Sequence, residues 1–371
     1  MGSTICLGLI SGTSLDAIDA AACRFDEQGR WQGLLATRSH PYPPGLRGEL
    51  LDLQAQPDQK LSLRDFARMD AQVGDCFAEA AQALLQQAGL SSAQISAIGS
   101  HGQTVFHDPQ QIGTSLQLGD PNRIAARTGI ATVGDLRRAD MALGGQGAPL
   151  VPAFHQAVFA SDLPRAVVNI GGIANITVLP ANPQQAVFGF DTGPGNGLMD
   201  EWIQLHRQRT YDADGGWAAS GVAQDALLRA WLAEPYFAAA APKSTGRDYF
   251  KLDWARHPAD LSAYRPQDVQ ASLLELSARS IAEALLRAAP QSAEVLICGG
   301  GARNGELMRR LAELLAPRAV RSTSAAGLDP DWVEAAAFAW LAWRRVHEVA
   351  GNLPAVTGAS RSAVLGGLYR P

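Results

Sequence analysis

Glycine-rich turns that follow short apolar runs constrain the fold of this chain more than any other sequence feature. They occur at Gly12-Thr13-Ser14, at Asn169-Ile170-Gly171-Gly172 with a companion at residues 189–196, and at residues 298–304. Each apolar run is typical of a buried strand. Glycine lets the backbone turn tightly and present N–H groups to an anion. Three such turns along one chain predict an α/β protein that holds a nucleotide between two halves.

Composition narrows the class of protein. The 371 residues are enough for two domains, and 47% of them are hydrophobic. A net charge of −5 without a run of Lys or Arg argues against nucleic-acid binding. The sequence lacks a basic leader and a long apolar window, so we expect no signal peptide, no membrane span and a cytoplasmic location. The cysteines share no metal-like spacing, and we expect buried free thiols at Cys6, Cys23, Cys76 and Cys298.

The order of elements predicts two similarly built α/β halves. In the first half we expect an antiparallel meander of strands at 4–10, 17–25 and 31–40, a helix that begins at Ser62 and closes at Gly89, a strand at 95–100, and a short helix and strand within 116–134. A glycine-rich loop at 135–149 follows. The second half is expected to hold strands at 166–170, 174–179, 187–191 and 295–298, with helices at about 196–208, 220–232, 268–289, 304–315 and 331–347.

Two of the turns carry groups suited to a nucleotide. Thr13 and Ser14 can donate hydrogen bonds to phosphate, and Asp16 or Asp19 could orient a hydrated cation; a plain hairpin turn is the alternative. The glycines at 299–301 leave room for a base or sugar against the backbone, although a structural strand-to-helix turn would also need glycine. Asn304 either contacts the ligand or caps the following helix.

A small number of titratable side chains are candidates for chemistry. Asp191 is expected to end a strand and to act as a general base, with a local Asx turn as the alternative. His101 is expected where a strand ends, either contacting substrate or lying in an ordinary loop. Glu334 lies in the first turn of the last helix, where the helix dipole alone would favour an acid. Lys243 is not part of a P-loop, because Pro242 precedes it where that motif needs glycine. Lys243 and Arg247 could still bind an anion from a loop, with solvated surface charge as the alternative.

The whole set of motifs resembles the anhydro-N-acetylmuramic acid kinases, a branch of the sugar kinase–Hsp70–actin superfamily. The resemblance runs almost end to end and rests on these blocks: 8–16, 99–104, 144–152, 169–172, 189–196, 243–247 and 298–301. One departure is Ala17, where the family often has glycine.

The resemblance implies two actin/Hsp70/hexokinase-like domains with an interdomain nucleotide cleft, formed by residues 1–133 with 358–371 and by residues 134–357. It also implies a reaction. ATP, with Mg²⁺, phosphorylates O6 of 1,6-anhydro-N-acetylmuramic acid while water opens the anhydro bridge, giving N-acetylmuramic acid 6-phosphate in cell-wall recycling. Asp191 would activate the water, and Glu334 would hold sugar hydroxyl groups.

Further roles follow from the same resemblance. It implies nucleotide contacts from Gly12, Thr13, Ser14, Leu15, Asp16, Ala17, Ile18, Asp19, Asn169, Gly171, Gly172, Gly193, Gly299, Gly300, Gly301 and Asn304. Substrate contacts are expected from Glu334, His101 and Ser11, and the loop at 135–149 is expected to form part of the sugar site. No direct metal ligand is identified. The amino sugar is the expected partner, together with a second copy of the chain in a homodimer.

Two other functions remain open from the sequence. Another sugar kinase of the same fold would phosphorylate a free hydroxyl without adding water. A regulatory or chaperone-like ATPase would need no small substrate, but the 24 residues after position 347 are too few for a peptide-binding domain.

Overall fold

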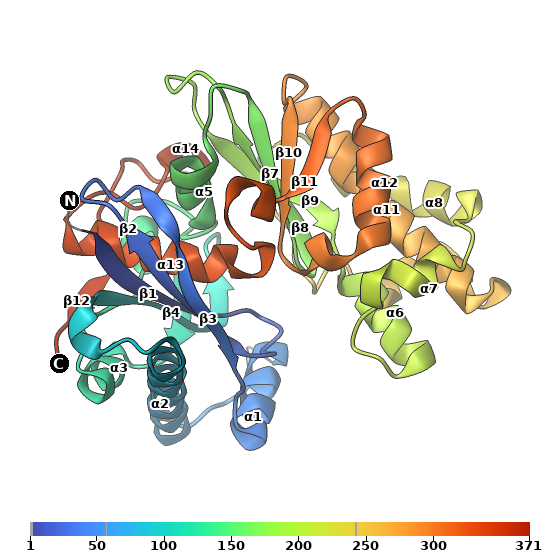
Figure 1. Cartoon of the computed structure of the whole chain (residues 1–371). Coiled ribbons are helices and arrows are strands. Elements are labelled where there is room, and N and C mark those ends of the chain that lie inside the picture. The colour runs from blue at the N-terminus through green and yellow to red at the C-terminus, as the bar shows by residue number, and fades with distance from the viewer. Residues whose placement is uncertain (1–2, 57, 242) are drawn as a thin grey trace. The chain divides into compact units, whose positions relative to one another are not determined.

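The computed structural model describes residues 3–56, 58–241 and 243–371, and it divides into two compact units (Figure 1). Unit 1 comprises Met1–Val158 and Trp332–Pro371, and unit 2 comprises Phe159–Asp331. Each unit has its own β-sheet and helices, so the predicted mixed α/β class is confirmed for both.

The sheet of unit 1 has the strand order β12-β6-β4-β1-β2-β3, with β5 paired to β4. Its strands are β1 (Thr4–Ser11), β2 (Ile18–Phe25), β3 (Trp31–His40), β4 (Ile95–Asp108), β5 (Thr114–Leu118), β6 (Thr132–Gly134) and β12 (Gly367–Tyr369). β1, β2 and β3 pair antiparallel in chain order, which confirms the predicted meander. β4 pairs parallel to β1.

The helices of unit 1 are α1 (Pro44–Ala55), α2 (Leu63–Ala88), α3 (Pro121–Thr128), α4 (Arg138–Met141), α5 (Val151–Phe159), α13 (Val333–Val346) and α14 (Pro354–Thr357). Of these, α2 and α13 pack on opposite faces of the sheet (Figure 1). The predicted ends of α2 are confirmed: the Ser62 side chain accepts from Asp65 N, and Gly89 closes the helix at φ 65°. The apolar stripe of α2 packs on Leu7 and Leu9 of β1.

Two glycines bring α13 against the other face of the same sheet. A Cβ atom on Gly8 of β1 would lie 1.8 Å from the Ala335 carbonyl oxygen, and one on Gly99 of β4 would lie 2.0 Å from that of Phe338. Only glycine permits this approach. The close packing makes α13 part of unit 1, so the structure divides the chain elsewhere than the predicted boundaries at 133/134 and 357/358.

The sheet of unit 2 has the order β11-β10-β7-β8-β9. Its strands are β7 (Arg165–Ile170), β8 (Ile173–Leu179), β9 (Phe188–Pro194), β10 (Glu294–Cys298) and β11 (Ala319–Ser322), and its helices are α6 (Gly197–Arg207), α7 (Gly216–Ala219), α8 (Asp225–Leu232), α9 (Pro235–Ala238), α10 (Leu252–Arg256), α11 (Pro266–Ala288) and α12 (Gly305–Leu315). The buried stripe of α11 that includes Leu274, Ile281 and Leu285 packs in one core with α6, α12 and the sheet, as its spacing predicts.

Short 3₁₀ turns complete the two units, at Ser92–Gln94, Ala213–Gly215, Leu261–Ala263, Gly300–Arg303, Thr323–Ala326 and Pro330–Trp332. The sequence did not predict α1, α5, α9, α10, α14, β5, β11 or β12, and the loop expected at 135–149 contains α4. It predicted the helix of 220–232 too early, because α8 begins only at Asp225. The four cysteines are buried free thiols, as expected. In the part of the chain that the structure describes, no helix has the length and apolar character to cross a bilayer.

Candidate active site

Asp191 of unit 2 lies within β9, not at its end, because β9 continues to Pro194. The expected strand end at this residue is therefore wrong: pairing of β9 with β8 extends as far as Ile173↔Pro194. Two backbone contacts fix Asp191 from outside the sheet. Its N–H donates to the Lys243 carbonyl at 3.1 Å, and its carbonyl accepts from the Tyr236 hydroxyl at 2.8 Å.

The Asp191 carboxylate is partly buried and accepts a hydrogen bond from the Thr245 backbone N–H at 3.0 Å, on Oδ2. Burial raises the pKa of Asp191 to about 6, and the Thr245 hydrogen bond acts in the opposite direction. The donor belongs to a segment 54 residues away, so this bond is not a local Asx turn. A carboxylate with a pKa near 6 is largely ionised at neutral pH and remains basic enough to take a proton from water.

Lys243 braces the segment that contacts Asp191. Its ammonium donates to the Tyr236 carbonyl at 2.8 Å and lies 4.5 Å from the centroid of the Tyr236 ring. Burial, and secondarily the nearby Arg287, lowers the pKa of Lys243. Because this ammonium is bound to the protein's own backbone, Lys243 stabilises the arrangement around Asp191.

The glycine turns of unit 2 meet one another. Gly195 N donates to Gly172 O at 2.9 Å, and Asn196 N donates to Gly171 O at 2.7 Å. A Cβ atom on Gly299 would lie 2.4 Å from the Asn169 Oδ1 atom. Because Cys298 pairs with Asn169 where the parallel strands β10 and β7 end, the predicted turns gather at one edge of the sheet. The close approach of these turns to one another already requires glycine, whether or not a nucleotide binds. The nucleotide contacts therefore stay a prediction.

The remaining predicted glycines of this group differ in their surroundings. A Cβ atom on Gly301 would meet Ile170, whereas Gly300 has only a loose neighbour, the Asn196 side chain at 3.7 Å. A Cβ atom on Gly193 would lie 2.6 Å from the Phe237 ring, so this glycine packs against the aromatic side chain.

Arg247, for which the sequence left open an anion contact or a solvated surface charge, is a cation beside the predicted phosphate turn. The Cδ atom of Arg247 lies 2.9 Å from the Cβ position of Gly172. The turn also leads into α6, whose first residue is Gly197, and helix N-termini favour anions. The signal for Arg247 in the sequence was its place in the block 243–247 shared with the family.

Asn304 caps α12. Its Oδ1 atom accepts from Leu307 N at 3.0 Å, which confirms the capping role that the sequence left open. This bond uses the side-chain carbonyl oxygen only, so a nucleotide contact from the amide group stays a prediction.

In unit 1, hydrogen bonds to backbone carbonyl groups fix the turn after β1. Leu15 N donates to Gly12 O at 3.1 Å, Gln103 Nε2 donates to Gly12 O at 3.3 Å, and Arg47 Nε donates to Leu15 O at 2.7 Å. The Leu15 and Ile18 side chains are fully buried in the core, so these two residues can offer a ligand only their backbone.

The polar side chains of this turn remain accessible. Thr13 and Asp16 are exposed, Ser14 and Ala17 are half-buried, and Asp19 accepts a hydrogen bond from the Ser39 hydroxyl at 2.6 Å. Hydroxyl and carboxylate oxygens therefore line the turn where phosphate and a hydrated cation were expected.

A second cluster in unit 1 joins two of the predicted substrate residues through Arg137. His101 lies in the middle of β4, not at a strand end as expected, because β4 continues to Asp108 and pairs with β5. Arg137 Nε donates to His101 Nε2 at 3.0 Å, and Arg137 Nη1 donates to Gly147 O at 2.7 Å. Burial lowers the pKa of Arg137 to about 10, and the charge of Glu334 acts against that shift.

Ser11, the third predicted substrate residue, ends β1 and is only 2% exposed. The cluster of His101, Arg137 and Glu334 places the loop at 135–149 beside α13, and the sequence did not single out Arg137 within that loop. For a metal ion, the described residues contain no group of three or more His, Cys, Asp or Glu side chains that could hold one.

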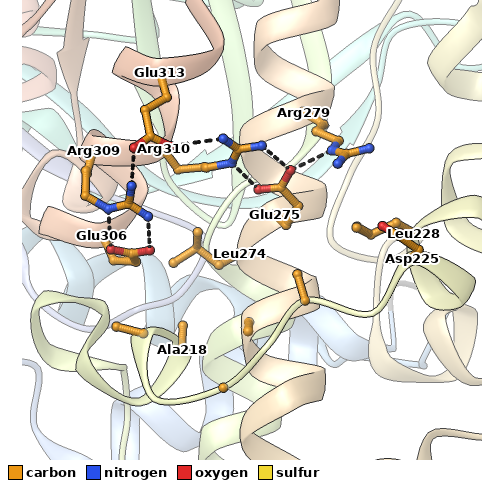
Figure 2. Close-up of a pocket in the computed structure, with 14 residues that line it drawn as sticks. Ala218, Asp225, Leu228, Leu274, Glu275, Arg279, Glu306, Arg309, Arg310 and Glu313 are labelled. Atoms are coloured by element: carbon orange, nitrogen blue, oxygen red, sulfur yellow. Dashed lines mark hydrogen bonds and ion pairs between the residues drawn. The ribbon is translucent and has the colours of Figure 1, made fainter.

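A cavity of about 330 Å³ in unit 2 contains none of the predicted site residues (Figure 2). It lies beside α11 and α12, and its charged side chains bind one another. The buried Glu275 accepts from Arg279 Nε at 2.6 Å and from Arg310 Nη2 at 2.8 Å, and Arg309 pairs with Glu306 at 2.6 Å. The Arg310–Glu275 pair links α12 to α11, while the other two pairs lie within one helix each, so we assign this cavity a structural role.

Comparison with known proteins agrees with this arrangement of motifs. Residues 4–371 match the sequence pattern of the family described as anhydro-N-acetylmuramic acid kinase. The chain is 50% identical over 370 residues to an anhydro-N-acetylmuramic acid kinase from Xanthomonas campestris, covering 99% of this chain and 97% of the relative. It is 48% identical over 365 residues to one from Coxiella burnetii, covering 98% and 96%.

Among solved structures, component A of (R)-2-hydroxyglutaryl-CoA dehydratase from Acidaminococcus fermentans is similar in fold. Its TM-score is 0.52 at 11% sequence identity, and the match covers 93% of this chain and 99% of that one. At this identity the likeness concerns the fold alone.

Proposed function

The chain belongs to the anhydro-N-acetylmuramic acid kinase family, and from this premise we propose that it phosphorylates 1,6-anhydro-N-acetylmuramic acid with ATP. In the proposed reaction, water opens the anhydro bridge at C1 as O6 receives the γ-phosphoryl group. The product, N-acetylmuramic acid 6-phosphate, would return cell-wall sugar to metabolism in the cytoplasm.

The environment of Asp191 is the observation that carries this proposal. Its carboxylate has a raised pKa of about 6, is fixed by Thr245, and is held by Tyr236 and Lys243 through its backbone. A general base is most effective when its pKa lies near the working pH, and positional restraint improves proton transfer further.

The proposed step balances without a separate acid. Asp191 takes a proton from water, the water oxygen bonds to C1, and the C1–O6 bond breaks. The electron pair left on O6 attacks the γ-phosphorus, and ADP departs. Because phosphorus captures O6, the leaving oxygen needs no protonation, and Asp191 later returns its proton to solvent.

Phosphoryl transfer asks the protein mainly for positioning and charge stabilisation. Thr13, Ser14 and the turn at Gly171 and Gly172 would contact the phosphates, with Arg247 as a nearby cation. Mg²⁺, when bound, supplies neutralisation of phosphate charge. The exposed carboxylate of Asp16 suits it, because hydrated Mg²⁺ prefers oxygen ligands, and Asp19 would help to hold its water shell.

The test is product analysis by mass spectrometry after reaction of ATP with the anhydro sugar in ¹⁸O-labelled water. We expect a sugar 6-phosphate that carries one ¹⁸O atom at C1. A phosphorylated sugar without label would retain a kinase of this fold acting on a free hydroxyl but remove the water-activating role of Asp191. ATP hydrolysis without any sugar product would favour the regulatory ATPase.

The family resemblance also leads us to propose a homodimer. Light scattering coupled to size-exclusion chromatography should give twice the chain mass of 39.2 kDa. A mass of one chain across the working concentration range would contradict this part of the proposal.

A further inference from the structure

His101 has no ring nitrogen left to bind a sugar. An arginine can only donate, so Nε2 of His101 must accept the hydrogen bond from Arg137 Nε at 3.0 Å. The proton of the neutral ring then lies on Nδ1, which donates to the Gly102 carbonyl at 2.9 Å. Burial and the charge of Arg137 lower the pKa of His101 well below its ordinary value, which keeps the ring neutral.

Two sets of contacts connect His101 with the neighbourhood of Glu334. The His101 ring packs against Phe338, with 4.8 Å between ring centroids. Phe338 follows Glu334 by four residues on α13, so both side chains lie on the same helix face. By the second route, the Arg137 guanidinium bound to His101 interacts electrostatically with the Glu334 carboxylate.

Arg137 is restrained at both ends of its guanidinium. Besides the bond to His101, its Nη1 atom donates to Gly147 O at 2.7 Å. Both of these acceptors are neutral, so they hold the guanidinium in place without cancelling its charge. A planar guanidinium offers five N–H groups in fixed directions, which allows it to orient a carboxylate as well.

We propose that Arg137 and His101 are positioning residues for Glu334: His101 fixes the guanidinium, and the guanidinium orients the Glu334 carboxylate toward the sugar hydroxyl groups. The inference rests on the proposed function, in which Glu334 binds the sugar. It reassigns His101, which supports the site through Arg137 and does not contact the substrate itself.

The test is a double-mutant cycle read in steady-state kinetics with the anhydro sugar and ATP. Arg137→Met should raise the sugar KM about 10- to 100-fold and leave the ATP KM unchanged, in line with loss of a hydrogen-bonded charge. Glu334→Ala should have a similar effect. The double variant should be no worse than Glu334→Ala within about threefold, because residues that act through one another are not additive.

His101 is tested by rescue. His101→Leu removes the acceptor for Arg137 and should raise the sugar KM about tenfold, whereas His101→Gln retains an acceptor and should recover most of the loss. In the Arg137→Met background both changes should have little effect. Arg279→Met is the matched control, because it removes an arginine from another buried carboxylate, Glu275, outside the site, and the sugar KM should not change.

Several results separate this inference from the proposed function. If Arg137→Met and Glu334→Ala multiply their effects, or if the ATP KM rises with the sugar KM, Arg137 does not act through Glu334. If Arg137→Met does not fold by thermal unfolding, Arg137→Lys and the His101 pair give the same comparison without removing the charge. Absence of sugar turnover in the unmodified protein would overturn the proposed function and this inference with it.

Discussion

Two carboxylates, one in each unit, have opposite surroundings: Asp140 is fully buried and Asp191 is partly buried. Asp140 of unit 1 is fully buried, and both of its oxygens accept hydrogen bonds: Oδ2 from Gly147 N at 2.9 Å, and Oδ1 from Asn352 Nδ2 at 2.6 Å and Thr357 Oγ1 at 2.7 Å. Asp191 of unit 2 accepts one bond from the described residues, from Thr245 N to Oδ2.

The difference shows that burial does not identify a catalytic acid or base by itself. The three donors around Asp140 tie the loop at 135–149 to the C-terminal segment, and a buried charge with a full set of donors stabilises structure. Asp191 lacks such compensation, so burial raises its pKa to about 6 and leaves an oxygen available for a reacting water.

The comparison predicts the largest effect for Asp191→Asn. Turnover should fall about 10²–10⁴-fold, the usual contribution of a general base, because the amide cannot take a proton from water. The KM for ATP should remain within about threefold. Initial-rate kinetics with saturating ATP and sugar measures both quantities. Thr192→Ser, which changes the neighbouring residue but keeps its hydroxyl, serves as a control and should retain turnover.

Near-normal turnover of Asp191→Asn would remove Asp191 from the mechanism. It would also remove the contrast with Asp140, because both carboxylates would then be structural.

Asp140→Ala should affect stability and not chemistry. Removing the carboxylate leaves three buried donors without their acceptor, which we expect to reduce the free energy of unfolding by about 3 kcal/mol. Urea denaturation measures the loss. Asp140→Asn retains one acceptor oxygen and should lose less. If Asp140→Ala unfolds like the unmodified protein but loses turnover, Asp140 belongs to the chemistry and the comparison fails.

Activity and stability should both depend on pH through the titration of Asp191. With a pKa of about 6, kcat/KM should fall about tenfold per pH unit below that value, because the protonated acid cannot act as a base. The stability effect has the opposite direction. The folded pKa lies above the ordinary value of 3.8, so the folded protein binds the proton more tightly, and its stability falls as pH rises from about 4 through 6.

Above pH 6 the ionised Asp191 should therefore cost about 3 kcal/mol, and Asp191→Asn should remove that cost. Thermal unfolding should show Asp191→Asn gaining more stability over the unmodified protein at pH 8 than at pH 5. An equal difference at both pH values would mean that the pKa of Asp191 is not raised.

The sequence predicted those elements whose signals are local. Ser62 and Gly89 delimit α2, and the apolar spacing within it matches the buried face that the structure shows. The end of β4 was missed because Gly102 looks like a turn residue. The strand continues through this glycine at φ 72°, since pairing with β1 and β5 outweighs the local preference.

In the candidate site, too, the sequence predicted the residues with local signals and missed those whose contacts depend on the fold. Asp191 was found because a distinctive glycine-rich turn follows it in the chain. Tyr236 and Thr245 lie 45 and 54 residues away, and their contacts arise only when the chain folds back on β9. Arg137 was missed because a charged residue in a glycine-rich loop usually lies in solvent.

Asn304 is expected to show the smallest effect. Its side-chain oxygen accepts a hydrogen bond from Leu307 N within the protein, which leaves only its amide group for a ligand. Asn304→Ala removes the cap of α12 and should lower the free energy of unfolding by about 1 kcal/mol. Asn304→Asp keeps an acceptor for Leu307 N and should retain stability, but it loses the amide donor. If that donor binds the nucleotide, Asn304→Asp should raise the ATP KM about 3- to 10-fold, the range of one hydrogen bond. Urea denaturation and ATP titrations measure the two effects separately. An unchanged ATP KM in both variants would make Asn304 a cap alone, a residue whose function is structural in the same sense as that of Asp140.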